Sequence, residues 1–176
     1  MPRAFTAIDI PQNIAEKLAE TQQKIGVGKP KSPEKMHITL EFFQDINEKE
    51  IETIQKGLER TKLEPFQVKV KGLGVFPSKD HIRVLWAGID SNSIREVYRE
   101  TSKSTPESDN THEFMPHVTI SRVKNMRRGD KKKIHRGLEK YQDRRFGEFE
   151  ASNIKLYRSD FTQKGTKYTE LYVENL

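Results

Sequence analysis

The amino-acid sequence predicts an α+β fold of two lobes related by a pseudo-twofold axis, each an antiparallel sheet with helices packed on its outer face. The first observation behind this prediction is a repeated tetrapeptide, since His37-Ile-Thr-Leu recurs 80 residues later as His117-Val-Thr-Ile. The second is that helix and strand patterns follow one another in the same order around each copy. The third is that the strand patterns are short and half polar, which is typical of antiparallel sheets with one open face. We therefore expect the two His-x-Thr strands to meet in a central cleft.

In the first half of the chain, apolar periodicity separates strands from helices. Strand patterns alternate at every second residue, whereas helix patterns place apolar residues three or four positions apart. The helix opened by Pro11 has this spacing at Ile14 and Leu18 and ends at Gly26. The expected elements are a strand over 3–9, a helix over 11–25, a basic loop over 29–35, the first His strand over 36–43, a helix after a capping box at Asn47 and Glu50, and strands over 66–75 and 82–89.

The second half of the chain repeats this order after Asp90. The expected elements are a helix with Ile94, Val97 and Thr101, a polar loop over 104–113, the second His strand over 115–123, a helix from Asp130, and two closing strands over 149–157 and 167–173. Few positions besides the motif match between the halves, so the duplication is one of architecture. We expect residues 1–176 to form a single bilobal domain, because this length is enough to bury one core.

Composition excludes several classes of protein and site. The chain has no cysteine, which excludes disulfides, thiolate nucleophiles and thiolate metal ligands. It has no apolar run of about 18 residues and no secretory leader, so we expect a cytoplasmic protein without a membrane partner. The net charge of +6 favours a polyanionic partner.

A basic run follows the second motif. Over residues 122–136 there are eight basic residues and a single acidic one, Asp130. The basic residues are Arg122, Lys124, Arg127, Arg128, Lys131, Lys132, Lys133 and Arg136. Such a run is either a solvated helix face or a surface that follows a nucleic-acid backbone, and the sequence leaves both interpretations open.

The two motifs are expected to present a pair of imidazoles and a pair of hydroxyls. Residues i and i+2 of a strand point to the same face, so His37 lies beside Thr39 and His117 beside Thr119. Histidine titrates near neutrality, so one imidazole can act as base and the other as acid on a cyclic phosphodiester. The hydroxyls can hydrogen-bond the non-bridging phosphoryl oxygens. A lone histidine in a strand is usually structural, but two matched copies favour catalysis.

Two more residues are candidates for binding the substrate. Arg122 can hold a phosphate through two hydrogen bonds, although on a straight strand it would point away from His117. Its alternative role is that of a surface residue at a strand end. Phe42 can stack on a base, although strict alternation would turn it away from His37. Trp86 is expected in the core.

The remaining polar residues give no sign of a metal site. No cysteine or carboxylate near the motifs has the spacing of zinc ligands, so we expect no metal and no other cofactor. His81, His112 and His135 have no partner motif and are expected at the surface.

The motifs resemble those of the 2H phosphoesterase superfamily, which is named for two His-x-Thr/Ser-x sequences. Within it, the chain is similar to the bacterial and archaeal RNA 2′,3′-cyclic phosphodiesterases, historically called 2′-5′ RNA ligases. The segments that carry the resemblance are Arg3–Pro11, Met36–Phe42, Gly74–Pro77, Arg83–Trp86, Pro116–Arg122, Leu156–Ser159 and Tyr168–Leu171. They cover the chain nearly from end to end.

The resemblance implies an enzyme without a cofactor that opens RNA 2′,3′-cyclic phosphate ends to 2′-phosphomonoesters. With an RNA 5′-hydroxyl in place of water, the same site could form or break a 2′-5′ linkage. The implied partner is RNA with a 2′,3′-cyclic phosphate end, for example a tRNA fragment, and we expect the protein to act as a monomer.

The resemblance also implies a role for each site residue. His117 would activate the attacking water and His37 would protonate the leaving 3′ oxygen, although pseudo-symmetry makes the two nearly interchangeable. The other implied roles are phosphoryl-oxygen binding by Thr39 and Thr119, phosphate binding by Arg122 and base stacking by Phe42.

Two other functions remain open at this point. The first is a phosphodiesterase of a small nucleotide, such as a cyclic dinucleotide, ADP-ribose cyclic phosphate or 2′-5′ oligoadenylate, and dispensable basic residues over 127–136 would favour it. The second is a non-catalytic RNA-binding module, and the intact histidine, threonine and arginine positions argue against it.

Overall fold

The computed structural model describes residues 2–110 and 112–176, so that Met1 and Thr111, the latter in the expected polar loop, lie outside the described residues. Over the described ranges the chain forms four α-helices, a 3₁₀ turn and nine strands. The helices are α1 (Gln12–Ile25), α2 (Glu48–Arg60), α3 (Ile94–Ser104) and α4 (Asp130–Lys140), and the 3₁₀ turn is η1 (Pro33–Lys35). The strands are β1 (Arg3–Asp9), β2 (Lys29–Pro30), β3 (His37–Phe43), β4 (Phe66–Pro77), β5 (Ile82–Asp90), β6 (His117–Arg122), β7 (Arg145–Ala151), β8 (Asn153–Thr162) and β9 (Gly165–Asn175).

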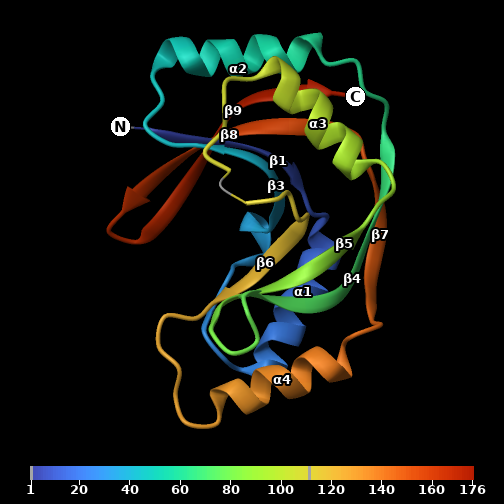
Figure 1. Cartoon of the computed structure of the whole chain (residues 1–176), viewed down its shortest axis with the longest axis vertical. Coiled ribbons are helices and arrows are strands. Elements are labelled where there is room, and N and C mark those ends of the chain that lie inside the picture. Colours follow the sequence, from blue (N-terminus) through green and yellow to red (C-terminus); the bar gives the residue numbers. More distant parts are fainter. Residues whose placement is uncertain (1, 111) are drawn as a thin grey trace.

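All strand pairs are antiparallel, and they form one sheet with two lobes. The strand order is β7-β4-β5-β6-β3-β1-β8-β9, and β2 pairs with β6. We call β3, β1, β8 and β9 with α2 and α3 the His37 lobe, and β6, β5, β4 and β7 with α1 and α4 the His117 lobe. Figure 1 shows α2 and α3 at one end of the molecule and α4 at the other, with β3 and β6 between them. The predicted two-lobed α+β architecture is confirmed, and the two lobes share one continuous sheet.

Local signals set the helix ends. α1 begins after Pro11 and ends at Gly26, whose φ of 70° lies in the left-handed region that favours glycine. α2 begins at the predicted capping box. The Asn47 side chain accepts a hydrogen bond from the Glu50 amide at 3.0 Å, and the Glu50 carboxylate accepts one from the Asn47 amide at 2.8 Å.

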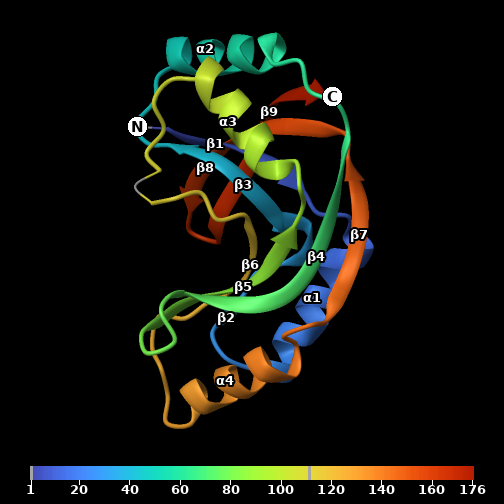
Figure 2. The same cartoon turned by 45° about the vertical axis from the view of Figure 1, so that its right-hand side comes forward.

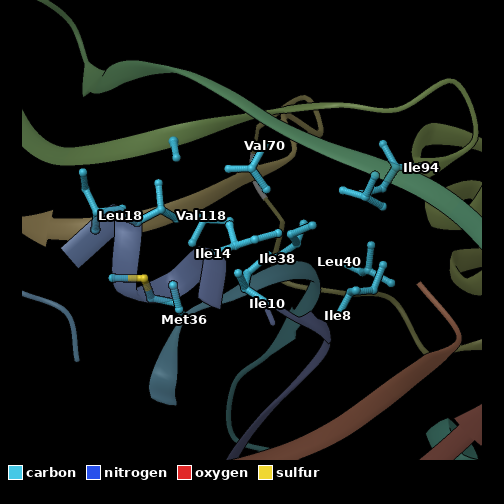
Figure 3. Packing of buried hydrophobic residues seen from close by; sticks show 14 of the residues in the cluster. Ile8, Ile10, Ile14, Leu18, Met36, Ile38, Leu40, Val70, Ile94 and Val118 are labelled. Atoms are coloured by element: carbon cyan, nitrogen blue, oxygen red, sulfur yellow. The ribbon is translucent and has the colours of Figure 1, made fainter. Parts of the chain in front are cut away.

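The apolar residues of the two motifs lie at the centre of the core. Ile38 and Val118 are fully buried, and they belong to the same core cluster as Ile14 of α1 (Figure 3). Burying an aliphatic side chain of this size contributes about 1.5–3 kcal/mol. The packing therefore fixes the buried face of each motif strand and leaves the opposite face open.

The C-terminal part of the chain differs from the prediction. One strand was expected over 149–157, but the chain forms β7 and β8 there, which separate at Ser152. β7 pairs with β4 in the His117 lobe, whereas β8 pairs with β1 in the His37 lobe. Because the chain runs on from one lobe to the other without reversing, no turn residues mark the boundary. Figure 2 shows β7 following the edge of the His117 lobe.

Candidate active site

The two motifs meet at the junction of the lobes. Ile38 of β3 pairs with Val118 of β6 in antiparallel register. His37 and Thr39 flank this pair on one strand, and His117 and Thr119 flank it on the other. All four flanking side chains are partly exposed. The register therefore brings both motifs onto one open face, with each histidine opposite the threonine of the other motif and the two histidines on a diagonal.

Each motif strand has an irregularity directly after the motif. The register of β3 against β1 shifts between Thr39 and Glu41, and the register of β6 against β5 shifts between Thr119 and Ser121. A bulge of this kind adds one residue to a strand, so the side chains beyond it change face. Both bulges lie at the same position relative to their motif, so the pseudo-twofold symmetry continues beyond the motifs.

The bulges determine where Phe42 and Arg122 point. On a straight strand both residues would be turned away from the histidines, which is the arrangement that strict alternation predicts. The burial along the strands follows the bulges instead, with two consecutive buried residues before Phe42 and before Arg122. Phe42 consequently lies on the open face with His37, and Arg122 lies on it with His117.

Both imidazoles are held by the same main-chain contact. Nδ1 of His37 lies 2.8 Å from the carbonyl oxygen of Lys35, and Nδ1 of His117 lies 2.7 Å from that of Met115. A carbonyl oxygen only accepts hydrogen bonds, so Nδ1 carries the proton in each ring. Nε2 is then the atom of each ring that can exchange a proton with a ligand.

Aromatic rings pack around His37. Phe5 stacks on the imidazole with ring centroids 4.8 Å apart, and Tyr168 contacts it edge-on at 5.6 Å. Phe5 is buried, as core packing predicts, but its contact with His37 also makes it part of the site. Apart from the family resemblance, the sequence gives no signal for Tyr168, because β9 reaches His37 only through the order of the sheet.

Aromatic rings also pack around His117. Phe76 contacts the imidazole edge-on at 4.9 Å, and the centroid of Trp86 lies 6.1 Å away. Trp86 was expected in the core, but it is only partly buried and lies beside the site. None of the described residues provides a hydrogen-bond partner for its buried Nε1.

Burial lowers the pKa of both imidazoles. For His37 the pKa falls to about 4, through burial first and then through the positive charge of Lys31, against smaller opposing effects that include the carboxylate of Asp9. For His117 burial is again the largest cause of a lowered pKa, and the charge of Arg122 lowers it further. Both rings are therefore neutral at pH 7 before a ligand binds. A bound anion would raise both pKa values, because a nearby negative charge favours the protonated form.

The expected polar loop lies along the end of β3. The Asp109 amide donates to the Phe42 carbonyl at 2.9 Å, and the Asn110 side chain accepts from the Phe42 amide at 3.3 Å. Asp109 also accepts from the Gln44 amide at 2.6 Å. These contacts place the loop beside Phe42, at the end of the open face nearer His117.

A cavity of about 450 Å³ opens beside His37. It is lined by Asp9, Glu34, Lys35, His37, Tyr157 and Tyr168, and by residues 162 and 164–167 of the β8–β9 hairpin. A second cavity of about 530 Å³ lies between the β4–β5 hairpin and α4, where Trp86 and His135 line it.

The other predicted surface residues lie outside this face. His81 accepts a hydrogen bond from Arg83 at 3.1 Å, a ring nitrogen of His135 lies 2.9 Å from the Lys79 carbonyl, and His112 is exposed. Over residues 2–110 and 112–176, no three or more His, Asp or Glu side chains gather in a way that could hold a metal ion. None of the helices in these ranges has the length and apolarity needed to span a membrane.

The basic run forms an exposed surface on the His117 lobe. All eight basic side chains over residues 122–136 are exposed. Lys131 forms a surface ion pair with Asp80 at 3.5 Å. Asp130, the single acid of the run, accepts a hydrogen bond from the Arg127 amide at 2.8 Å. The Asp130 carboxylate therefore caps the loop that precedes α4 by a hydrogen bond to the backbone.

Comparisons with known proteins identify the family. Residues 8–86 match the family described as LigT like Phosphoesterase. A relative from Methanocaldococcus jannaschii, named RNA 2′,3′-cyclic phosphodiesterase, is 39% identical over 170 residues, which cover 94% of this chain and 96% of the relative. The chain belongs to the LigT-like phosphoesterase family of the 2H superfamily.

Other proteins similar to this chain agree with it in sequence and in fold. A relative from Aquifex aeolicus with the same name is 36% identical over 173 residues, covering 94% of this chain and 90% of the relative. The crystal structure of TT0787 of Thermus thermophilus superimposes with a TM-score of 0.80 at 26% identity, over 99% of this chain and 97% of that one. The LigT-like fold thus extends over the whole length of the chain, beyond the residues that the family description matches.

Proposed function

We propose that this protein hydrolyses the 2′,3′-cyclic phosphate ends of RNA to 2′-phosphomonoesters. The observation that carries the proposal is the pair of His-x-Thr motifs on one open face. Nδ1 of each imidazole is hydrogen-bonded to a main-chain carbonyl, which leaves Nε2 free to exchange a proton with the substrate. Opening a cyclic diester needs one group that takes a proton and one that gives a proton, and two imidazoles can supply both. The name of the M. jannaschii and A. aeolicus relatives supports this choice of substrate.

In the proposed reaction, His117 is the base and His37 is the acid. Nε2 of His117 takes a proton from water while the water oxygen forms a bond to phosphorus. The bond from phosphorus to the 3′ oxygen breaks on the opposite side, and this oxygen leaves with the electron pair. Protonated Nε2 of His37 donates its proton to the 3′ oxygen, which gives a 3′-hydroxyl and a 2′-phosphate. Because the pKa of His37 is about 4 without a ligand, the negative charge of the bound phosphate is needed to keep this ring protonated.

The remaining site residues bind the substrate in this proposal. Thr39 and Thr119 donate hydrogen bonds to the non-bridging oxygens, on which negative charge increases in the transition state. Arg122 balances the charge of the phosphate, and its effect on the pKa of His117 supports a place near the reacting atoms. Phe42 offers an aromatic face for the terminal base.

We further propose that the site also joins or cleaves 2′-5′ linkages when an RNA 5′-hydroxyl replaces the water. The activity would reside in one bilobal domain over residues 1–176. It would need neither a metal nor another cofactor, because the two histidines supply the acid and the base. Since one chain supplies both motifs, we expect a monomer, acting in the cytoplasm on RNA fragments such as those of tRNA.

Incubation with a defined RNA tests the proposal. Purified protein in EDTA would be mixed with a short RNA ending in a 2′,3′-cyclic phosphate, and the 2′- and 3′-phosphate products would be separated. We expect the 2′-phosphate alone, and none with His37→Ala or His117→Ala. A 3′-phosphate product would contradict the assigned leaving oxygen, and absence of turnover would contradict the function.

A further inference from the structure

One end of the open face carries a lysine that the proposed reaction does not use. Lys31 follows β2, and its backbone amide donates to the Ile120 carbonyl at 2.9 Å, which attaches it to the second motif strand. Its Nζ donates to the Tyr168 hydroxyl at 2.7 Å, and the same tyrosine ring contacts His37. Lys31 therefore lies beside the reacting groups although it belongs to a loop that the sequence presents as merely basic.

The environment of Lys31 is that of a cation without a counter-ion. Burial, followed by the charges of Arg122 and Lys35, lowers the pKa of Lys31 to about 8. Among the described residues, no carboxylate forms an ion pair with Lys31. A desolvated charge is unfavourable unless an opposite charge accompanies it. An anionic group of a ligand would remove this penalty.

The opposite end of the face is aromatic and apolar. β3 and β6 run antiparallel, so Arg122 lies toward the His37 end of the face and Phe42 toward the His117 end. The exposed Met115 and the ring of Phe76 lie at the His117 end as well. The two histidines are nearly equivalent by symmetry, but the groups beyond them are not.

This polarity gives an RNA strand a direction. In a ribonucleotide the base at C1′ and the 5′ carbon at C4′ are attached on either side of the ring oxygen, so that the base adjoins the 2′ oxygen and the 5′ carbon adjoins the 3′ oxygen. When the cyclic phosphate lies between the histidines and the base lies at Phe42, the 5′ side of the nucleotide is directed to the cationic end. The cavity beside His37, which Tyr168 also lines, has about 450 Å³ for a further nucleoside there.

We infer that Lys31, together with Tyr168, binds the phosphodiester that precedes the terminal nucleotide. The inference rests on the proposed function and specifies its substrate as an oligonucleotide with a cyclic end, in preference to a mononucleoside cyclic phosphate. Lys31 is a specificity-determining residue in this assignment, since it acts on a phosphate that does not react.

Two substrates that differ only in this phosphodiester test the inference. The first is adenosine 2′,3′-cyclic phosphate, and the second is the dinucleotide ApA with a 2′,3′-cyclic end. We expect Lys31→Met to lower the ratio of kcat/KM for the dinucleotide over that for the mononucleoside by about 10-fold or more, the size expected for a charged hydrogen bond. Lys31 also affects the pKa of His37, but this effect changes kcat/KM for both substrates by the same factor. It therefore cancels in the ratio.

Matched variants complete the test. Lys62→Met removes the same charge from an exposed position after α2 and should leave the ratio within about 2-fold, the spread expected for surface changes. Lys31→Arg should keep most of the preference, because it retains the charge. Tyr168→Phe should lower the preference in part, because the hydroxyl that holds Nζ is lost. A ratio unchanged by Lys31→Met, or lowered equally by Lys62→Met, would overturn the inference.

If Lys31→Met is inactive, the binding of the reaction products can be measured in place of turnover. Calorimetry would compare ApA with a 2′-phosphate end against adenosine 2′-phosphate, and the variant should lose about 10-fold of the preference for the dinucleotide product. An equal loss for both products would contradict the assignment. If the unaltered protein cleaves neither substrate, the proposed function fails, whereas product binding still decides the role of Lys31.

Discussion

Ile38 and Val118 form the backbone pair at which the two lobes join, and both side chains are fully buried. Each is the central residue of a His-x-Thr motif, so the distance between the two histidines depends on how well this pair is packed. Protein interiors are closely packed, so the loss of one methyl group leaves a void that disturbs the packing of the neighbouring side chains. The same pair therefore connects the stability of the fold with the geometry of the site.

Shortening Ile38 should destabilise the protein and loosen the site. We expect Ile38→Val to lower the free energy of unfolding by about 0.5–1.5 kcal/mol and Ile38→Ala by about 2–5 kcal/mol. Urea denaturation followed by circular dichroism measures both. The equally buried Ile54 of α2 is the control, since Ile54→Val should be as destabilising but leave kcat unchanged. Equal losses of kcat in the two variants would contradict a link between the pair and the site.

Removing either imidazole should stop most of the chemistry. We expect His37→Ala and His117→Ala each to lower kcat by roughly 10²–10⁴-fold, as is typical when a general acid or base is lost. His81→Ala is the control, because the exposed His81 ring accepts its hydrogen bond from Arg83, outside the site, and the variant should retain full activity. Rates are measured on a short RNA with a cyclic phosphate end, after thermal melting has shown that each variant folds. Near-normal rates in both motif variants would rule out the two-histidine mechanism.

The lowered pKa values predict a pH profile shifted to the acid side. Catalysis needs one protonated and one neutral imidazole, and this combination is most populated between the two pKa values of the free enzyme, both of which lie below 6.5. We expect kcat/KM to fall by about 10-fold per pH unit above pH 6.5, as one required proton is lost. kcat should fall only at higher pH, because the bound phosphate raises the pKa of the acid.

Arg122 provides the matched control for this profile. Its positive charge lowers the pKa of His117, so Arg122→Gln should raise that pKa and move the fall in kcat/KM to higher pH. KM should rise as well, because a charged contact to phosphate is lost. A value of kcat/KM that stays constant from pH 6 to pH 8 in the unaltered protein would contradict the assignment.

Elements with a complete local signal were predictable from the sequence. The strand over 3–9 matches β1, and the capping box at Asn47 and Glu50 starts α2. The pairing of the motifs was also predictable, because packing demands alone rarely place one tetrapeptide pattern at matching positions of two repeated halves. Strands β7 and β8 could not be separated, since the extended chain passes between lobes without a turn.

Features that depend on distant partners were not predictable. The bulges after the motifs arise from pairing with β1 and β5, and they reverse the direction expected for Phe42 and Arg122. The contact between Lys31 and Tyr168 joins residues 137 positions apart, and no local pattern indicates it. The stack of Phe5 on His37 likewise needs β1 beside β3.

Activity should persist when metals are removed. The proposed reaction needs an acid, a base and hydrogen-bond donors, and His37, His117, Thr39 and Thr119 can supply them. Protein dialysed against EDTA should therefore keep its kcat within about 2-fold on the same RNA. Loss of activity in EDTA, followed by recovery with one added divalent metal but not with others, would show that a metal takes part.

Reversing the charge of α4 should weaken the binding of long RNA. The triple substitution of Lys131, Lys132 and Lys133 by Glu changes three exposed side chains at the start of this helix. Each phosphate contact that is lost should lower the slope of log Kd against log salt by about 0.7 for single-stranded RNA. The effect should be absent for a dinucleotide with a cyclic end, because α4 lies at one end of the molecule (Figure 1) and a dinucleotide has few phosphates to bind there. An unchanged salt slope for long RNA would show that the basic run is a solvated helix face, and an effect on the dinucleotide would instead point to a disturbed site.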